Sequence, residues 1–138
     1  MNDTIPSEII LSKIIVIRGK KVILDKDLAM LYKVETAQLK RQVRRNQDRF
    51  PDDFMFELTA GEFETLRCQI GISSWGGTRY MPMAFTEQGV AMLSSVLNSD
   101  RAIKVNIQIR IIFDAIKELL KDESKPKKRI GFNVKNAE

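Results

Sequence analysis

The stretch DKDLAMLYKVETAQLKRQVRRNQDRFP, residues 25–51, joins two short helical patterns to the densest basic cluster of the chain. Its first pattern is an Asp-rich start followed by apolar residues spaced three and four apart, which are Leu28, Leu31 and Tyr32. This spacing predicts one buried helix face of about two turns. A second helix is expected from Thr36 to about Arg49, with Leu39 and Val43 pointing inward. Two short helices with a tight connection between them predict a helix-turn-helix unit.

The outward side of this second helix is rich in cations and amides. Arginine can form two hydrogen bonds with one guanine, and Gln and Asn can do the same with adenine. A Thr at the start of a helix can donate to a phosphate. The candidate DNA-binding residues are Thr36, Gln38, Lys40, Arg41, Gln42, Arg44, Arg45 and Asn46. We expect the cations to contact phosphates and the others to offer base-edge groups. Thr36, Gln38 and Arg41 are expected nearest the groove because they lie early in the helix.

A solvated helix face is the alternative interpretation, since basic amphipathic helices are often simply exposed. Between Thr36 and Arg49, however, Asp48 alone opposes five positive charges, and a merely soluble face usually contains more acids. Residues 1–49 have 11 basic and 6 acidic side chains, residues 50–100 have 2 and 7, and residues 101–138 have 10 and 5. A net charge of +5 with basic ends favours a polyanion such as double-stranded DNA as the partner.

The composition argues against catalysis. The chain has no histidine, which removes the commonest general base and the commonest zinc ligand. It also lacks a Gly-rich phosphate loop, so no cofactor, no metal and no catalytic residue are expected. A carboxylate-metal nuclease using Glu57, Glu62 or Glu64 is the enzymatic alternative. Those acids are better explained as a helix cap and a solvated face.

The chain is expected to fold as one cytoplasmic globular unit. A length of 138 residues, with 43% hydrophobic and 30% charged side chains, fits one domain with a core. The apolar run from Ile14 to Ile17 is too short to cross a bilayer, and the N-terminus has no export signal, so no membrane association is expected. Cys68 cannot form a disulfide within the chain, which fits a reducing compartment, and we expect it to be a small core residue.

Two short hairpins are expected on either side of the helix-turn-helix. β-Branched runs at residues 14–17 and 22–24, separated by a turn at Gly19, predict the first. Residues 72–81, which contain a Gly pair, predict a second, wing-like hairpin. Its Arg79 is a further candidate DNA contact because an Arg beside a flexible turn can reach a minor groove.

Other local signals complete the fold prediction. A strand is expected at residues 54–58, a helix at residues 60–70 after the capping box formed by Thr59 and Glu62, and another helix at residues 87–97. The predicted fold class is therefore α+β, with a helix-turn-helix core, flanking short β-hairpins and a long C-terminal helix.

The final helix is expected from about Asp100 to Lys121 and is apolar on two sides. One set of residues alternates four and three apart, as in a helix-pairing seam: Val105, Ile109, Ile112, Ile116 and Leu119. A second stripe consists of Ile103, Ile107, Ile111 and Leu120. Such a helix either lies deep in the domain or buries one stripe against a second copy. A homodimer through the helix around Val105 to Leu119 is therefore one prediction.

The two ends of the chain are expected to lie outside the core. Residues 1–12 are expected to form a flexible N-terminal segment, residues 13–121 a single DNA-binding domain, and residues 122–138 a basic, mobile tail. The cations of that tail are Lys125, Lys127, Lys128 and Arg129. They either keep the end soluble or hold DNA without sequence preference.

A resemblance to a known family rests on two long strings. GKKVILDKDLAMLYKVETAQLKRQVRRNQDRFPDDFMFELT and SSWGGTRYMPMAFTEQGVAMLSSVLNSDRAI resemble the phage-type N-terminal DNA-binding domain named after open reading frame six, a relative of the KilA-N domain. The resemblance spans about residues 15–112. It implies a bacterial, prophage-derived DNA-binding protein of the antirepressor type, with a compact α+β core. The family's second helix would correspond to residues 36–46 and its wing to residues 73–80.

Lys33 departs from that family, because related sequences often have glycine at this position of the turn. If the turn needs a positive φ angle, Lys33 is strained there by about 1 kcal/mol.

Two functions remain as competing hypotheses. The leading one is a sequence-selective duplex-DNA-binding protein that regulates transcription and has no catalytic activity. The rival is a protein-interaction module, an antirepressor that binds a repressor protein through the final helix and the acidic middle of the chain without contacting DNA. Salt-sensitive retardation of DNA fragments in a gel separates the two, since a partner-only module should show none.

Overall fold

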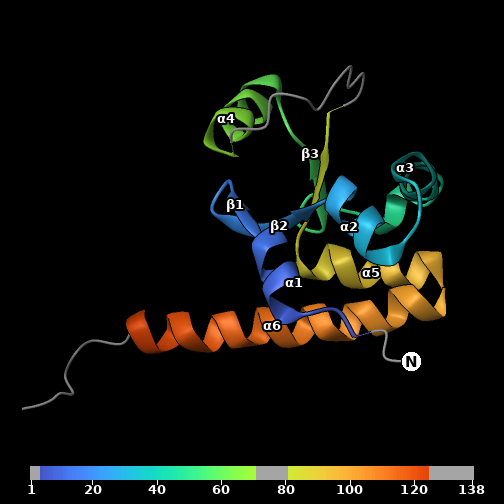
Figure 1. Ribbon diagram of the computed structural model, residues 1–138. Helices are drawn as coiled ribbons and strands as arrows, with labels where there is room; N and C mark the ends of the chain where they lie inside the picture. The colour runs from blue at the N-terminus through green and yellow to red at the C-terminus, as the bar shows by residue number, and fades with distance from the viewer. Residues whose placement is uncertain (1–3, 71–80, 125–138) are drawn as a thin grey trace, which may run out of the picture.

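The structure is a computed structural model that describes residues 4–70 and 81–124 (Figure 1). In chain order its elements are α1 (Ser7–Lys13), β1 (Ile15–Ile17), β2 (Lys20–Leu24), α2 (Asp25–Tyr32), α3 (Thr36–Arg45), the 3-10 helix η1 (Gln47–Arg49), β3 (Met55–Glu57), α4 (Ala60–Ile70), β4 (Met83–Phe85), α5 (Glu87–Leu97) and α6 (Asp100–Ser124). The predicted α+β fold class is confirmed, as is the long C-terminal helix.

The strands form one antiparallel sheet with the order β1-β2-β4-β3. The first predicted hairpin is confirmed, with Val16 opposite Lys21. Strand β4 was not expected from the sequence, although it is central: it pairs with β2 through Ala84 and Phe85 and with β3 along all three of its residues. The predicted second hairpin falls mainly on residues 71–80, which lie outside the described residues.

The sheet is covered by helices on both faces, because successive side chains of a strand point to opposite sides. Ile23 of β2 belongs to the larger core cluster, which also takes residues from α1, α2, α3, α5 and α6. Its neighbours Val22 and Leu24 belong to a second cluster with Leu66 of α4. Figure 1 shows the same division, with α4 on one side of the sheet and α5 and α6 on the other. Val22, Ile23 and Leu24 of β2 are therefore all buried, although they point to alternate faces of the sheet.

The β1–β2 turn is joined to α4 by an ion pair between Arg18 and Glu62. Arg18 and Gly19 both have positive φ angles, 58° and 73°, as a two-residue hairpin turn of type I′ requires. Arg18 Nε and Nη2 donate to the two carboxylate oxygens of Glu62, at 2.7 and 3.0 Å. Glu62 also forms the predicted capping box with Thr59, at 2.8 and 3.1 Å. The hydrogen bonds from Arg18, followed by that from the Thr59 N–H, lower the pKa of Glu62 to about 2.

The expectation of a flexible segment at residues 1–12 is wrong for residues 7–12, which belong to α1. Ile10 of this helix is fully buried. The Gln108 side chain of α6 also accepts from the Ile5 N–H at 3.1 Å and donates to the Ile5 carbonyl at 2.8 Å. The short pattern of α1 gives little helical signal by itself, because its apolar contact surface is supplied by α6. At the other end, α6 reaches Ser124 rather than Lys121, so the first residues of the expected tail are helical.

The start of α5 packs closely against the segment before β3. Thr86 caps α5 by accepting from the Gly89 N–H, and its own hydroxyl donates to the Asp53 carbonyl at 2.7 Å. The Thr86 N–H donates to the Phe54 carbonyl at 3.0 Å. A Cβ atom at Gly89 would lie 1.8 Å from that same Phe54 oxygen. Glycine is therefore the residue that lets α5 approach this backbone.

We expect Gly89→Ala to lower the free energy of unfolding by about 3 kcal/mol or more, since a backbone oxygen cannot be displaced as a flexible side chain can. Gly61→Ala in α4 is the matched control, because its nearest neighbour, Thr59 Oγ1, is 3.9 Å from the added carbon. Urea denaturation followed by circular dichroism measures both. Equal stability of the two variants would show that the close approach at α5 is not as described.

The connection between α2 and α3 spans only residues 33–35. The Val34 N–H donates to the Ala29 carbonyl at 3.0 Å and the Lys33 N–H to the Met30 carbonyl at 3.2 Å, which is a Schellman ending of α2. Lys33 has a φ angle of 60°, in the left-handed region that favours glycine. Lys33 therefore occupies the strained position that the departure from glycine predicted.

Lys33→Gly should raise the free energy of unfolding by about 1 kcal/mol, because glycine adopts this conformation without a Cβ penalty. Lys33→Ala removes the same side chain but keeps the penalty, so it should give no gain. Urea denaturation of the three proteins at one pH makes the comparison. A Gly variant no more stable than the Ala variant would contradict the assigned strain.

Candidate nucleic-acid interface

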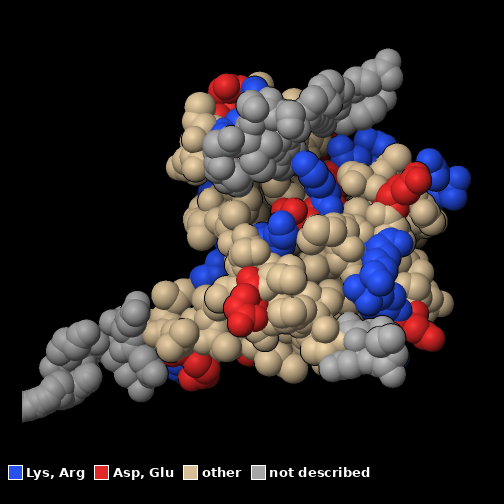
Figure 2. Space-filling model, viewed as in Figure 1, with Lys and Arg blue, Asp and Glu red and all other residues tan. Residues whose placement is uncertain are grey.

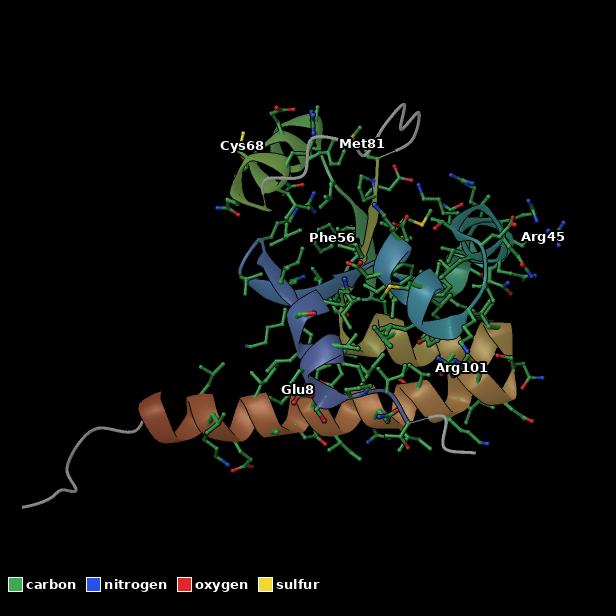
Figure 3. All side chains as sticks on the ribbon, in the orientation of Figure 1. Glu8, Arg45, Phe56, Cys68, Met81 and Arg101 are labelled. Carbon is green, nitrogen blue, oxygen red and sulfur yellow. The ribbon has the colours of Figure 1, made fainter. Side chains whose placement is uncertain are left out.

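Helix α3 has one buried and one exposed side. Leu39 and Val43 lie in the main core, with no exposed surface. The opposite side places Gln38, Arg41 and Arg45 in solvent, one turn apart along the helix. Figure 3 shows Arg45 pointing away from the body of the molecule, and Figure 2 shows Lys and Arg side chains gathered around α3. We call the exposed residues Ala37, Gln38, Arg41, Arg44 and Arg45 the α3 outer face.

Arg41 and Arg45 of this face are open to an anionic ligand. Among the described residues, no carboxylate forms an ion pair with either of them. Arg44 and Arg45 are in the last turn of α3, where positive charge is favourable to the helix dipole. The helix dipole therefore helps α3 to carry several arginines close together.

The prediction that Lys40 contacts DNA is corrected by the structure, because Lys40 does not belong to the α3 outer face. Its Nζ atom lies 3.3 Å from Asp25 Oδ2 and donates to the Met81 carbonyl, also at 3.3 Å. The side chains of Lys40 and Asp25 are only 11% and 3% exposed. A phosphate in solution cannot displace such a buried partner easily, so we assign Lys40 to the support of α3 and not to phosphate contact.

The Asp25 carboxylate makes the contacts that hold α3 in place. Its Oδ1 accepts from the Lys26 N–H at 2.6 Å, and its Oδ2 accepts from the Met83 N–H of β4 at 3.1 Å. Burial raises the pKa of Asp25, while the charge of Lys40 and the Met83 hydrogen bond act in the opposite direction. The N-cap position of α2 is Leu24, and Asp25 is the first helical residue. The carboxylate thus joins α2, α3 and β4.

The remaining predicted residues are less accessible than the arginines. Thr36 and Gln42 are half-buried. The Asn46 side-chain amide donates to the Gln42 carbonyl at 2.9 Å, so it satisfies the end of α3 instead of standing free for a base. The α-helix also ends at Arg45, not near Arg49, because Asn46 leaves the helical conformation and η1 follows.

Arg79, the remaining DNA-binding candidate, lies outside the described residues.

Ala37 is a residue of the face that sequence reasoning missed. It lines a hollow of about 350 Å³ together with Lys40, Arg41 and Arg44. Its small, exposed side chain leaves room between longer ones, and an alanine methyl group can contact a thymine methyl. The available signal was its position, since Ala37 is the second residue of α3 and lies on the same side as Arg41.

Two further cations lie near α3. Lys33 is exposed in the connection that precedes the helix. Arg101, labelled in Figure 3, donates from Nε to the Leu31 carbonyl at 3.0 Å and so joins the start of α6 to the end of α2. This bond satisfies a carbonyl of the last turn of α2.

Two of the three acids of the nuclease alternative have other roles. Glu62 is held by Arg18 and Thr59, and Glu64 pairs with Arg67 at 3.1 Å. Within residues 4–70 and 81–124, no group of three or more His, Cys, Asp or Glu side chains could hold a metal ion. Cys68, expected in the core, is instead exposed on α4 (Figure 3). In the same part of the chain, no helix is both long and apolar enough to cross a membrane.

We expect Lys40→Met to lower the free energy of unfolding at neutral pH by about 3 kcal/mol, because it leaves the buried Asp25 carboxylate without its cation. Arg41→Met, a change of the same kind one residue later on the exposed side, should have little effect. Chemical denaturation measures both.

The loss of unfolding free energy caused by Lys40→Met should also become smaller as the pH falls towards the raised pKa of Asp25, since a protonated carboxyl needs no cation. A loss that is the same at every pH, or equal in both variants, would contradict the assigned pair.

Comparison with known proteins relates most of this chain, including α3, to a described family. A family model described as the ORF6N domain matches residues 12–96, which is more than half of the chain. No curated protein and no solved structure matched the chain. The matched residues include α2, α3 and the sheet, whereas α6 follows them.

Proposed function

We propose that this chain, which belongs to the phage-type ORF6N domain family, is a DNA-binding regulator that contacts duplex DNA with the α3 outer face. One observation supports the proposal above the others. Gln38, Arg41 and Arg45 are displayed together on a short helix whose opposite side is fixed in the core. An α-helix of this kind fits the major groove of DNA.

The exposed residues divide into two roles. Arg41, Arg44 and Arg45 provide guanidinium groups for phosphates, and Arg41 also lies early enough in α3 to reach a base edge. Gln38 is the first exposed amide of the helix and can pair with adenine. Ala37 leaves space beside it for close approach of a base pair. Thr36 and Gln42 take secondary roles because they are half-buried.

The support of α3 matters for this function as much as its surface. A recognition helix that could tilt would lose contacts along the groove, since its residues must meet several base pairs at once. The core residues Leu39 and Val43 fix one side of α3. The Lys40–Asp25 pair fixes the orientation relative to β4 and α2. The exposed cations Lys26 and Lys33 lie on or next to α2, where the first helix of such a unit crosses the phosphate backbone.

A regulatory or antirepressor role is the cellular function that we propose for this binding. The second candidate is a module that binds a repressor protein and no DNA. Exposed apolar residues on α6, among them Ile107 and Ile111, favour that candidate because they offer a surface for a protein partner. The two candidates use different surfaces, so variants of one surface separate them.

Charge reversal at Arg41 and Arg45 together should weaken binding to all DNA sequences. Each lost phosphate contact removes one released counterion, so the slope of log affinity against log salt should fall by about two. A gel-shift titration against mixed genomic fragments at several salt concentrations measures both quantities.

Lys20→Glu with Arg110→Glu is the matched control, because it changes the net charge equally at exposed positions on β2 and α6. The control should keep a slope near that of the unaltered chain. If the unaltered chain retards no DNA at low salt, the repressor-binding candidate is favoured instead. If the Arg41 and Arg45 variant binds as the unaltered chain does, α3 is not the interface.

A further inference from the structure

Helix α6 has two apolar sides, of which the fold uses one. Ala102, Val105, Ile109 and Phe113 are buried in the main core. This corrects the predicted pairing seam, because Val105 and Ile109 are covered by the chain itself and cannot meet a second copy. The other side of the helix is where an unexplained surface lies.

That surface is a row of apolar residues spaced four apart along α6. Its members are Ile103, Ile107, Ile111, Ala115 and Leu119, which we call the α6 ridge. The exposed fractions of its four large residues are 42%, 55%, 63% and 65% in that order. Single exposed apolar residues are ordinary, but a continuous row along most of a helix marks an interaction surface. Figure 1 shows that the C-terminal end of α6, where Leu119 lies, projects beyond the rest of the fold.

We propose that the α6 ridge pairs with the same ridge of a second copy of this chain. The two helices would run antiparallel, with Ile111 on the two-fold axis. In this register Ile107 lies opposite Ala115 of the partner and the two copies of Ile111 meet, so the centre of the interface is apolar and each contact occurs twice, as in an isologous interface. Ile103 and Leu119 lie on the two flanks of the ridge, because each step of four residues turns about 40° around the helix. The small Ala115 leaves room for the branched Ile107 side chain.

The charges beside the ridge agree with this register. Lys104 and Glu118 are both exposed, and each lies seven residues from Ile111 along α6. An antiparallel pair centred on Ile111 therefore places each lysine opposite the glutamate of the other copy. Neither residue forms an ion pair with another described residue. They are thus available for a contact between copies.

The ridge and the α3 outer face lie on different parts of the molecule. Figure 1 shows α3 on the far side of α5 from α6. Pairing through the ridge therefore leaves both α3 helices of the dimer uncovered, and the inference does not depend on the proposed function.

Reciprocal charge changes in the full chain test the pairing by analytical ultracentrifugation. The unaltered chain should sediment as a dimer. Lys104→Glu and Glu118→Lys should each raise the dimer dissociation constant about tenfold, because two attractive pairs become repulsive. The double variant K104E/E118K should restore the dimer. An equimolar mixture of the two single variants should form heterodimers, since their charges are complementary only across the two chains.

A stronger change at the axis gives a second test. Ile111→Glu should give a monomer, because two carboxylates would meet at the two-fold axis. Ser95→Glu at an exposed position of α5 is the control and should remain a dimer, with circular dichroism confirming that both variants are folded. A monomeric unaltered chain would overturn the proposal, whichever other segment or partner covers the ridge. So would a dimer that the Lys104, Glu118 and Ile111 changes do not affect.

Discussion

The buried ion pair between Asp25 and Lys40 is the interaction on which the arrangement of this fold depends. A carboxylate with so little exposed surface must be paired and hydrogen-bonded, and its partners here come from three different elements. Lys40 comes from α3, the Lys26 N–H from α2 and the Met83 N–H from β4. Satisfying one buried charge therefore fixes the position of α3 relative to the sheet. Leu39 and Val43 supply the apolar burial that holds the helix, but apolar contacts are not directional, whereas the ion pair is.

Local patterns in the sequence predicted the elements whose signals are complete within a few residues. The capping box of Thr59 and Glu62 located the start of α4, and the three-and-four spacing of Leu28, Leu31 and Tyr32 located α2. Elements that depend on distant partners were missed. Strand β4 is three residues long, and all three are buried, so it shows no alternation of polar and apolar residues. Helix α1 is stabilised by contacts with α6, which is distant in sequence, and these contacts cannot be read from seven residues.

The same distinction between local and distant information applies to the candidate site. Helical spacing correctly separated the buried Leu39 and Val43 from the exposed Gln38, Arg41 and Arg45. It could not show that Lys40 turns towards Asp25, because that pair joins positions fifteen residues apart through tertiary structure. On α6 the pattern contained two apolar rows, and sequence alone could not say which one the domain would cover. Helices α1, α2 and α5 pack against α6 and cover the row of Val105 and Ile109, which leaves the α6 ridge in solvent.

The display of the α3 outer face for contact with DNA, on a helix that the Asp25–Lys40 ion pair orients, is tested most directly by nuclear magnetic resonance. Amide chemical shifts of the full chain would be followed while a short random-sequence duplex is added at low ionic strength. We expect the largest changes at the α3 outer face, near Gln38, Arg41 and Arg45, with little change along the α6 ridge. Shifts confined to the α6 ridge, or no shifts on addition of the duplex, would contradict the account.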